Sequence, residues 1–494
     1  MNNNSSNTVQ AFWVMLGSLS AFGFVIVSSM LLSRYFNKSD YGTYKQVMYV
    51  YSSLIAVFTL GLPRAFSYFL PRVNKGQAKD LISKINLLLM SLGAIMSVFL
   101  FLGADFIANF LNNNDLTRPL RYFAIVPFFM LPTMGIEGIL ATYKQTKFLA
   151  VYRILTQLFI LLCVVIPVIF FDGTIISAII GFTISSFLCF LSAMYFKNRP
   201  LKGHIKVKSP YSLKNILDYT LPIMGASIWG IIIASSDQFF ISRYFGSEVF
   251  AEFANGSMEL PFVGMIIGAT SVVLSPVFSK QVFDKGQNAK SEVITLWRSV
   301  MSKTVKLIYP LVVFCFCFAD IIMVLLYGEQ YHNSGVFFQI KLLANFFTVM
   351  AYASLMLAIG GQNYYFKVHM YGAIVLVILE WISASFFESP YLITGVSVLC
   401  QLGRIIAMLL FISYFFKIRF VDLFPIKLIL NIVVPSFVVL YFLRYLFTYF
   451  IHINKMLMII IIFALYVLIF GLWVHYKKID YISIIKPLLS KIKR

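Results

Sequence analysis

Long apolar runs, separated by short polar breaks, follow one another from residue 11 to residue 476. About 20 apolar residues are enough for a helix to cross roughly 30 Å of hydrocarbon. The pattern therefore predicts an all-α, polytopic membrane protein with about fourteen transmembrane helices. The predicted spans are residues 11–32, 41–70, 85–111, 120–142, 154–171, 174–196, 220–241, 249–278, 304–327, 336–359, 368–387, 391–416, 428–450 and 456–476.

The Lys and Arg residues between these spans predict how the chain is oriented. Such residues collect in the cytoplasmic loops of membrane proteins. If the N-terminus is cytoplasmic, the cytoplasmic segments hold 29 of them and the opposite loops hold 6. We therefore expect both termini in the cytoplasm and an even number of spans. The first apolar run has no basic region before it and no cleavage site after it, so we expect it to be retained as a span.

Two short motifs occur twice at nearly the same offset. SRYF occupies residues 33–36 and 242–245, and KGQ occupies residues 75–77 and 285–287. The same register aligns Gly42 with Ala251. Six spans separate the copies, so both copies have the same orientation, as in a parallel repeat. The repeat predicts two pseudo-symmetric six-helix lobes that face each other across a central cavity.

The most basic loop, residues 197–214, lies near the middle of the chain and marks the boundary between the lobes. We predict an N-terminal lobe over residues 1–200, which holds spans 1–6, and a basic cytoplasmic linker over residues 201–219. The C-terminal lobe, with spans 7–12, covers residues 220–416. Residues 417–494 add spans 13 and 14 and a basic cytoplasmic tail.

Composition excludes several classes of protein. Apolar residues make up 60% of the chain and charged residues 12%, far from the composition of a soluble domain. The net charge of +21 is an orientation signal, because it comes from the cytoplasmic segments, and we expect no nucleic-acid partner. All five cysteines lie inside apolar runs, so we expect neither disulfides nor a metal site.

Enzyme motifs are weak or absent. The sequence has no phosphate-binding loop of the Walker type and no HExxH motif, and its five His residues have no ligand-like spacing. The outer loops are too short for a catalytic domain. We therefore expect a protein that is not an enzyme, does not hydrolyse ATP and needs no cofactor.

Basic residues inside the spans are candidate functional groups, because a charge at a helix centre costs about 2.5–3.5 kcal/mol on insertion scales. Arg64 lies deep in the second span, directly after Pro63, which favours a kink and exposed carbonyls. It would face a cavity and bind an anion, or form a structural ion pair. Arg404, near the middle of span 12, is the next candidate. Lys45, Lys341 and Arg444 lie near outer span ends, where long side chains reach water.

Acidic residues cluster on the seventh and eighth spans. Glu252 and Glu259 are seven residues apart, which predicts one helical face, and Pro261 follows. They would bind a cation or pass protons, or else neutralise basic groups on span 2. Asp237 adds a third polar position near the outer end of span 7. The other acidic residues in the spans are Asp105, Glu137, Asp320 and Glu380.

The first hairpin, LLSRYFNKSDYGTYKQ followed by GLPRAFSYFLPR, resembles the opening of Wzx-type polysaccharide or O-antigen unit flippases. These belong to the multidrug/oligosaccharidyl-lipid/polysaccharide (MOP) exporter superfamily. The resemblance implies a flippase that moves undecaprenyl-diphosphate-linked oligosaccharide across the bacterial cytoplasmic membrane by alternating access. It also implies a cationic cavity formed by spans 1, 2, 7 and 8. Arg64 and Lys45 occupy positions where cavity cations occur, whereas span 1 here has no basic residue.

Two other functions stay open. A cation-coupled multidrug exporter of the same superfamily would want a buried carboxylate in the first lobe, and span 1 has none. A membrane glycan polymerase would want a large outer loop or clustered catalytic residues. As partners we expect the lipid-linked substrate, membrane lipids, a coupled proton or sodium ion, and polysaccharide polymerase and export machinery.

Overall fold

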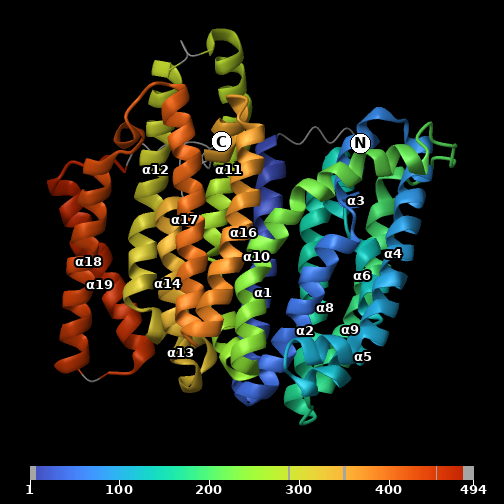
Figure 1. The fold of residues 1–494 in the computed structure, drawn as a ribbon, viewed down its shortest axis with the longest axis horizontal. Helices are drawn as coiled ribbons and strands as arrows, with labels where there is room; N and C mark the ends of the chain where they lie inside the picture. Colours follow the sequence, from blue (N-terminus) through green and yellow to red (C-terminus); the bar gives the residue numbers. More distant parts are fainter. Residues whose placement is uncertain (1–6, 287–289, 349–351, 452, 482–494) are drawn as a thin grey trace. The chain divides into compact units, whose positions relative to one another are not determined.

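The computed structural model describes residues 7–286, 290–348, 352–451 and 453–481. Within these ranges every regular element is a helix, so the all-helical prediction is confirmed (Figure 1). The chain forms two compact units, residues 1–254 and 255–494. Each unit has its own set of buried apolar side chains.

The first unit contains six helical spans followed by one very long helix. The long helices α1, α4, α8 and α9 run without a break, whereas two other spans consist of shorter helices separated by bends. The helices of this unit are α1 (Asn7–Tyr35), α2 (Lys38–Phe58), α3 (Leu62–Phe69), α4 (Lys75–Phe110), α5 (Thr117–Phe123), α6 (Val126–Met130), α7 (Ile136–Thr142), α8 (Thr146–Phe170), α9 (Ile175–Asn198) and α10 (Leu213–Gly256). The last two residues of α10 fall in the second unit.

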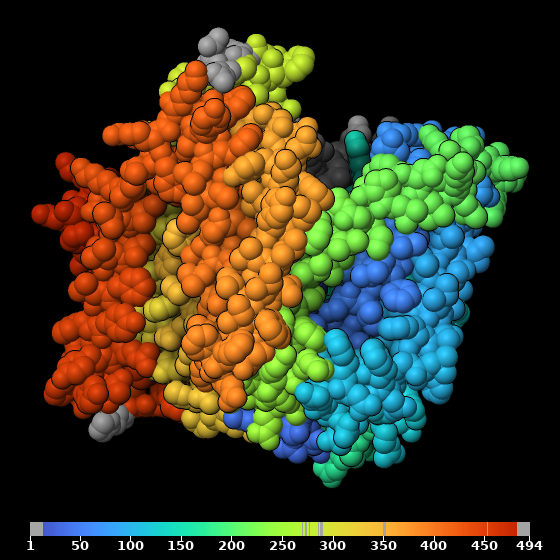
Figure 2. Space-filling model, viewed as in Figure 1, coloured from blue at the N-terminus to red at the C-terminus, as the bar shows by residue number. Residues whose placement is uncertain are grey.

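The second unit contains the remaining helices and ends in a hairpin. Its helices are α11 (Pro261–Lys285), α12 (Lys290–Cys317), α13 (Ala319–Tyr327), α14 (Ser334–Thr348), α15 (Tyr352–Ala358), α16 (Gln362–Phe386), α17 (Pro390–Phe415), α18 (Ile426–Tyr449) and α19 (Lys455–Tyr476). Within this unit α17 packs on α14 and α16, and α18 packs on α12 and α19. The α18 and α19 hairpin lies at the edge of the unit (Figure 2).

The number of spans agrees with the sequence pattern. Eleven helices of the described residues are long and apolar enough to cross a membrane, and two bent helix pairs raise the number to thirteen. The bent pairs cover the predicted spans 41–70 and 120–142, with bends of 47° and 40°. The remaining predicted span, 249–278, is divided in the structure. Its first residues belong to the end of α10, and α11, 25 residues long, begins at Pro261 and continues to Lys285. This is a multi-pass membrane protein.

Small residues allow the helices of the first unit to approach closely. A Cβ on Gly181 of α9 would lie 2.0 Å from the backbone oxygen of Cys163 on α8, and one on Gly17 of α1 would lie 2.8 Å from the Cα of Ala150. Helix association in lipid depends on such close backbone contact, because lipid tails are as apolar as the side chains. The two glycines thus allow α1 and α9 to pack closely on α8.

The two SRYF copies precede equivalent breaks. The first copy ends α1, and the chain leaves helical geometry at Asn37. The second copy lies in α10 directly before Gly246, whose φ of 77° and ψ of −178° interrupt the helix. The second KGQ copy begins at the last residue of α11, Lys285, and its final residue, Gln287, lies outside the described residues, as does most of the predicted basic tail. The lobe boundaries predicted around residues 201–219 stay a prediction.

Candidate substrate site

The chain bends between α2 and α3, where the sequence predicts a proline kink. Leu60 and Gly61 both have positive φ, 47° and 70°, and Pro63 lies in the first turn of α3. Proline is tolerated in a first helical turn because its missing N–H has no partner there. The break therefore precedes Pro63. The chain bends by 47° at this break, and Pro63 lies in the first turn of the helix that follows.

Arg64 follows this bend and is exposed. Its side chain makes no hydrogen bond or ion pair within the part of the chain that the structure describes, while its neighbours Ala65 and Phe66 are fully buried. Its guanidinium keeps five donors available to an oxyanion. Of the two hypotheses for Arg64, this geometry favours the anion-binding one, because no carboxylate of the described residues pairs with it.

A buried lysine, Lys197, lies close to helix α3, which carries Arg64. Lys197, at the end of α9, is completely buried. Its Nζ donates to Asn86 Oδ1 at 2.8 Å and to the backbone oxygens of Pro132 and Met134 at 2.7 and 2.6 Å. All three ammonium hydrogens are therefore used. Lys197 stabilises the carbonyls that the break between α6 and α7 leaves without helical partners.

Lys197 also lies against α3. Its Nζ is 4.7 Å from the centre of the Phe66 ring. The Phe66 ring also packs against Gly135, which has a φ of 77°. A Cβ on Gly135 would lie 2.2 Å from Phe66 Cδ2. Phe66, two residues from Arg64, is thus packed between Lys197 and Gly135. The sequence prediction missed Lys197, which it counted as the first residue of a basic loop; the only available signal was the apolar run that ends directly before it.

Lys45 contacts α1 with its ammonium group. Its Nζ donates to Ser29 Oγ at 3.0 Å and lies 5.1 Å from the centre of the Tyr41 ring. The side chain is half-buried. Arg64 is nineteen residues further along the chain, on the other side of the bend. Lys45 and Arg64 therefore occupy different levels of the same broken span.

Helices α2 and α10 cross closely within the first unit. A Cβ on Gly42 would lie 1.9 Å from the backbone oxygen of Ser247. Around this contact, Ser39 and Ser247 share a hydrogen bond of 3.1 Å, and Gln46 Nε2 donates to Ser242 Oγ at 2.8 Å. The second SRYF copy thus contributes Ser242 directly to the crossing.

The two carboxylates predicted on one helical face have different environments. Glu252 is buried, and its Oε1 lies 2.5 Å from Lys38 Nζ. Glu259 is exposed in the short break between α10 and α11. The prediction of one continuous helical face is wrong, because α10 ends at Gly256 and the residue before Pro261 is extended, as proline requires. Glu252 instead neutralises a basic residue of the second span.

Other charged residues of the spans form internal contacts. Asp237 is buried on α10, and its Oδ1 accepts a hydrogen bond of 2.8 Å from the backbone N–H of Gln238. In the second unit, Arg444 donates to both carboxylate oxygens of Asp320 at 3.1 and 2.6 Å. The Arg444 guanidinium also donates to the Cys317 carbonyl and keeps 30% of its side-chain surface exposed, so its access to water stays a prediction.

Arg404 lies inside the second unit beside a buried acid. Arg404 is buried on α17, and Glu380 of α16 is fully buried and interacts with it electrostatically. The aliphatic part of Arg404 packs on Gly372, where a Cβ would lie 2.5 Å from Arg404 Cδ. Its Nη1 has no hydrogen-bond partner in the described residues. The two N–H groups of this Nη1 thus remain available to another group.

The cysteines and the possible metal-ligating residues of the described chain add no candidate site to the charged groups described above. All five cysteines are free, and none is exposed. Among the described residues no group of three or more His, Cys, Asp or Glu could hold a metal ion. The charged groups discussed above are therefore the candidates for substrate contact.

Comparison with known proteins identifies the family. Residues 31–335, which include the bend at Gly61, the α2–α10 crossing and Lys197, match the family described as polysaccharide biosynthesis protein. The chain belongs to this family. No curated protein matches the sequence of this chain.

Solved structures identify the fold. The chain is similar to the lipid II flippase MurJ in an inward closed conformation, with a TM-score of 0.67 and 18% identity over 96% of this chain and 99% of that chain. It is also similar to a MOP superfamily transporter from Pyrococcus furiosus, with a TM-score of 0.58, 16% identity, and coverage of 84% and 95%.

A mutant of the Vibrio cholerae MATE transporter VcmN matches with a TM-score of 0.56 and 14% identity, over 82% of this chain and 96% of that chain. The polysaccharide biosynthesis protein described here thus has the fold of the MOP superfamily. These matches are to flippases and transporters and not to enzymes.

Proposed function

We propose that this protein is a flippase that moves undecaprenyl-diphosphate-linked oligosaccharide units from the inner to the outer leaflet of the bacterial cytoplasmic membrane. The observation that carries the proposal is Arg64, an exposed guanidinium without a partner in the described residues, held at a bend within the segment that matches the polysaccharide biosynthesis family. Arg64 would bind the diphosphate, because guanidinium groups bind phosphate oxygens in pairs.

The physical problem of the reaction fits such a residue. A diphosphate carries charge and the sugars are hydrated, so an unaided crossing would leave many polar groups unsatisfied in hydrocarbon. A protein cavity with fixed donors replaces that hydration, while the prenyl tail stays in lipid. Lys45 and Arg404 would supply further contacts to the head group or the sugars. Alternating access would carry the head from one side to the other.

The same proposal gives roles to the acidic residues and partners. Glu252, Glu259 and Asp237 would serve charge balance or the coupling of a proton or sodium ion. Glu252 already balances Lys38, which supports the first role for that residue. The product is an oligosaccharide on the outer leaflet, which a polysaccharide polymerase and export machinery would use. Both termini would lie in the cytoplasm.

The test is a flipping assay with purified protein in liposomes that contain a fluorescent undecaprenyl-diphosphate oligosaccharide. We expect Arg64→Gln to reduce flipping at least about tenfold, since a hydrogen bond to a charged group contributes about 1.5–3 kcal/mol. Arg64→Lys should recover part of the activity. The matched control is Arg118→Gln, which removes another exposed arginine of the same unit. Equal rates for wild type and Arg64→Gln would refute the assignment of Arg64.

A gene deletion separates this function from the second candidate, a cation-coupled drug exporter, which the similarity to the MATE fold favours. Accumulation of lipid-linked oligosaccharide on the cytoplasmic leaflet supports the flippase. Normal surface polysaccharide together with increased drug sensitivity would support the exporter.

A further inference from the structure

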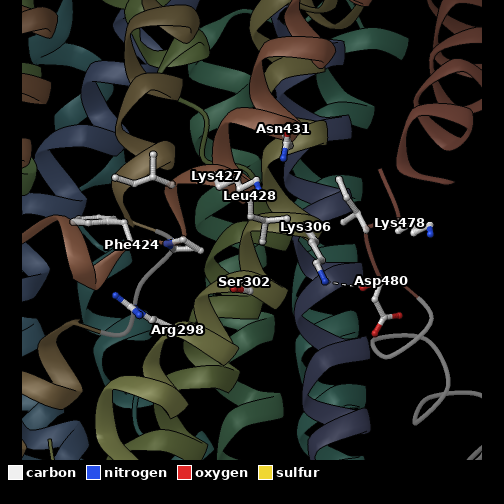
Figure 3. Close-up of a pocket in the computed structure, with 12 residues that line it drawn as sticks. Arg298, Ser302, Lys306, Phe424, Lys427, Leu428, Asn431, Lys478 and Asp480 are labelled. Atoms are coloured by element: carbon white, nitrogen blue, oxygen red, sulfur yellow. Dashed lines mark hydrogen bonds between the residues drawn. The ribbon is translucent and has the colours of Figure 1, made fainter. Parts of the chain in front are cut away.

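A basic cavity lies in the second unit, where α12 faces the start of α18 and the segment after α19, and none of its lining residues is assigned to transport. It has a volume of about 730 Å³. Figure 3 shows its walls: one face of α12, the start of α18 and the segment after α19. The positively charged residues that line it are Arg298, Lys306, Lys427 and Lys478.

The α12 wall follows from the sequence. Arg298, Ser302 and Lys306 are spaced four residues apart, so they form a single stripe about 12 Å long. The opposite wall includes the first turn of α18, where Lys427 is the second helical residue. The positive end of a helix dipole and the free N–H groups of a first turn favour an anion at this position.

Two of the cations are already partly engaged. Arg298 Nε donates to the backbone oxygen of Asp422 at 2.5 Å. Arg419 donates two hydrogen bonds to the Asp422 carboxylate, which holds the pKa of that carboxyl below its usual range. An ionised Asp422 therefore offsets part of the Arg298 charge, at a separation of 3.9 Å. Lys306 donates to the Asp480 backbone oxygen, a neutral acceptor, at 2.6 Å (Figure 3).

The other two cations are available. Lys427 and Lys478 are exposed, and neither side chain makes a hydrogen bond or ion pair within the described residues. Asp480 also lines the cavity, so the lining keeps an excess of positive charge. Two exposed lysines from two helix ends thus line one cavity without a carboxylate partner in the described residues, which favours an anionic ligand there.

The surface beside the cavity indicates which kind of anion fits. Ile426 lines the cavity, and Leu430 and Val434 follow it at four-residue steps on the same face of α18. These three side chains are 41%, 54% and 52% exposed. A strip of exposed apolar side chains thus leads from the cations along the length of α18. A ligand with a charged head and a long apolar tail matches both parts, whereas a soluble anion matches only the first.

We propose that this cavity binds the phosphate head group of an anionic phospholipid, with an acyl chain along Ile426, Leu430 and Val434. The loop charges predict that these helix ends lie on the cytoplasmic side, where anionic lipids and basic pockets between helices meet. The site would anchor the α18 and α19 hairpin to the leaflet. It is independent of the proposed transport reaction.

The test is native mass spectrometry of the full-length purified protein with phosphatidylglycerol and, separately, phosphatidylcholine. We expect wild type to retain phosphatidylglycerol preferentially, and Lys427→Gln combined with Lys478→Gln to retain it about 30-fold less well, as expected for the loss of two lysines near anionic lipid. The matched control combines Lys303→Gln with Lys367→Gln, which removes two exposed lysines of the same unit outside the cavity.

Three results would overturn the proposal. The first is equal loss of lipid in the control, which would indicate general surface charge. The second is equal retention of phosphatidylcholine by wild type. The third is displacement of the lipid by an excess of inorganic phosphate, which would indicate a soluble anion as the ligand. The exposed position of both lysines makes misfolding a poor explanation for lipid loss, and a thermal unfolding scan of each variant checks this.

Discussion

Lys38 and Glu252 form an ion pair of 2.5 Å that joins the first turn of α2 to the end of α10, 214 residues away in the sequence. The carboxylate is nearly buried, whereas the lysine keeps 25% of its side-chain surface exposed. Loss of one partner therefore leaves a charge that water solvates poorly.

We expect Lys38→Met to lower the free energy of unfolding by on the order of 2 kcal/mol, a reduced figure for a partly exposed pair. The double variant Lys38→Met with Glu252→Met should recover much of this loss, because it removes both charges. Thermal unfolding in detergent of both single variants and the double variant measures the coupling. Additive effects of the two substitutions would show that the pair contributes no coupling energy.

Lys197 should be the most sensitive lysine of the first unit. Lys197→Met leaves Asn86 Oδ1 and two backbone carbonyls without a donor, and we expect a loss of about 3–5 kcal/mol or failure to fold. Lys202→Met, five residues further on at an exposed position, is the control and should change stability by less than about 0.5 kcal/mol. Thermal unfolding compares the two. A similar melting temperature for both variants would contradict the role of Lys197 as an internal cap.

The bend between α2 and α3 depends on Gly61. Its φ of 70° is one that a residue with a Cβ rarely adopts, and a Cβ would also lie 3.0 Å from the backbone oxygen of Thr220. We expect Gly61→Ala to cost about 1–2 kcal/mol and to lower transport by changing the position of Arg64. Gly23→Ala on α1 is the control, since nothing lies within 4 Å of its added Cβ. Unfolding and flipping assays on both variants test this, and unchanged flipping in Gly61→Ala would separate the bend from transport.

The crossing of α2 and α10 depends on Gly42. An added Cβ would overlap the Ser247 backbone, which has no flexible end that can move aside. We expect Gly42→Ala to force the two helices apart and to lower stability by about 1–3 kcal/mol, the range for overpacking. Cross-linking of cysteines introduced at Ser39 and Ser247, whose hydroxyls are 3.1 Å apart, reports the separation directly. Efficient cross-linking in the Gly42→Ala background would show that the crossing tolerates a larger residue.

The sequence predicted the parts of the fold that depend on local pattern. Helical spans follow from runs of apolar residues, and a break near Pro63 is expected because proline cannot continue a helix, although the residues that turn the chain are Leu60 and Gly61. The repeat also aligned Gly42 with Ala251, and the structure gives a reason for small residues there: Gly42 lies at the helix crossing, and Ala251 is fully buried.

The sequence could not predict contacts that depend on three-dimensional proximity. The partners of Lys197 are carbonyls at residues 132 and 134, which become acceptors only because the chain breaks between α6 and α7. Similarly, helical spacing placed Glu252 and Glu259 on one face, but the break before Pro261 separates them. Helix ends inside a predicted apolar run thus caused both errors.

The absence of any exposed native thiol gives the chain a practical property. Cys163, Cys189, Cys315, Cys317 and Cys400 are all buried or half-buried, so water-soluble maleimides should react with them slowly. A single cysteine introduced at position 64 would therefore give a labelling signal with little background from the native residues. Its labelling from each side of a sealed vesicle would show directly which side of the membrane the bend faces in each conformational state.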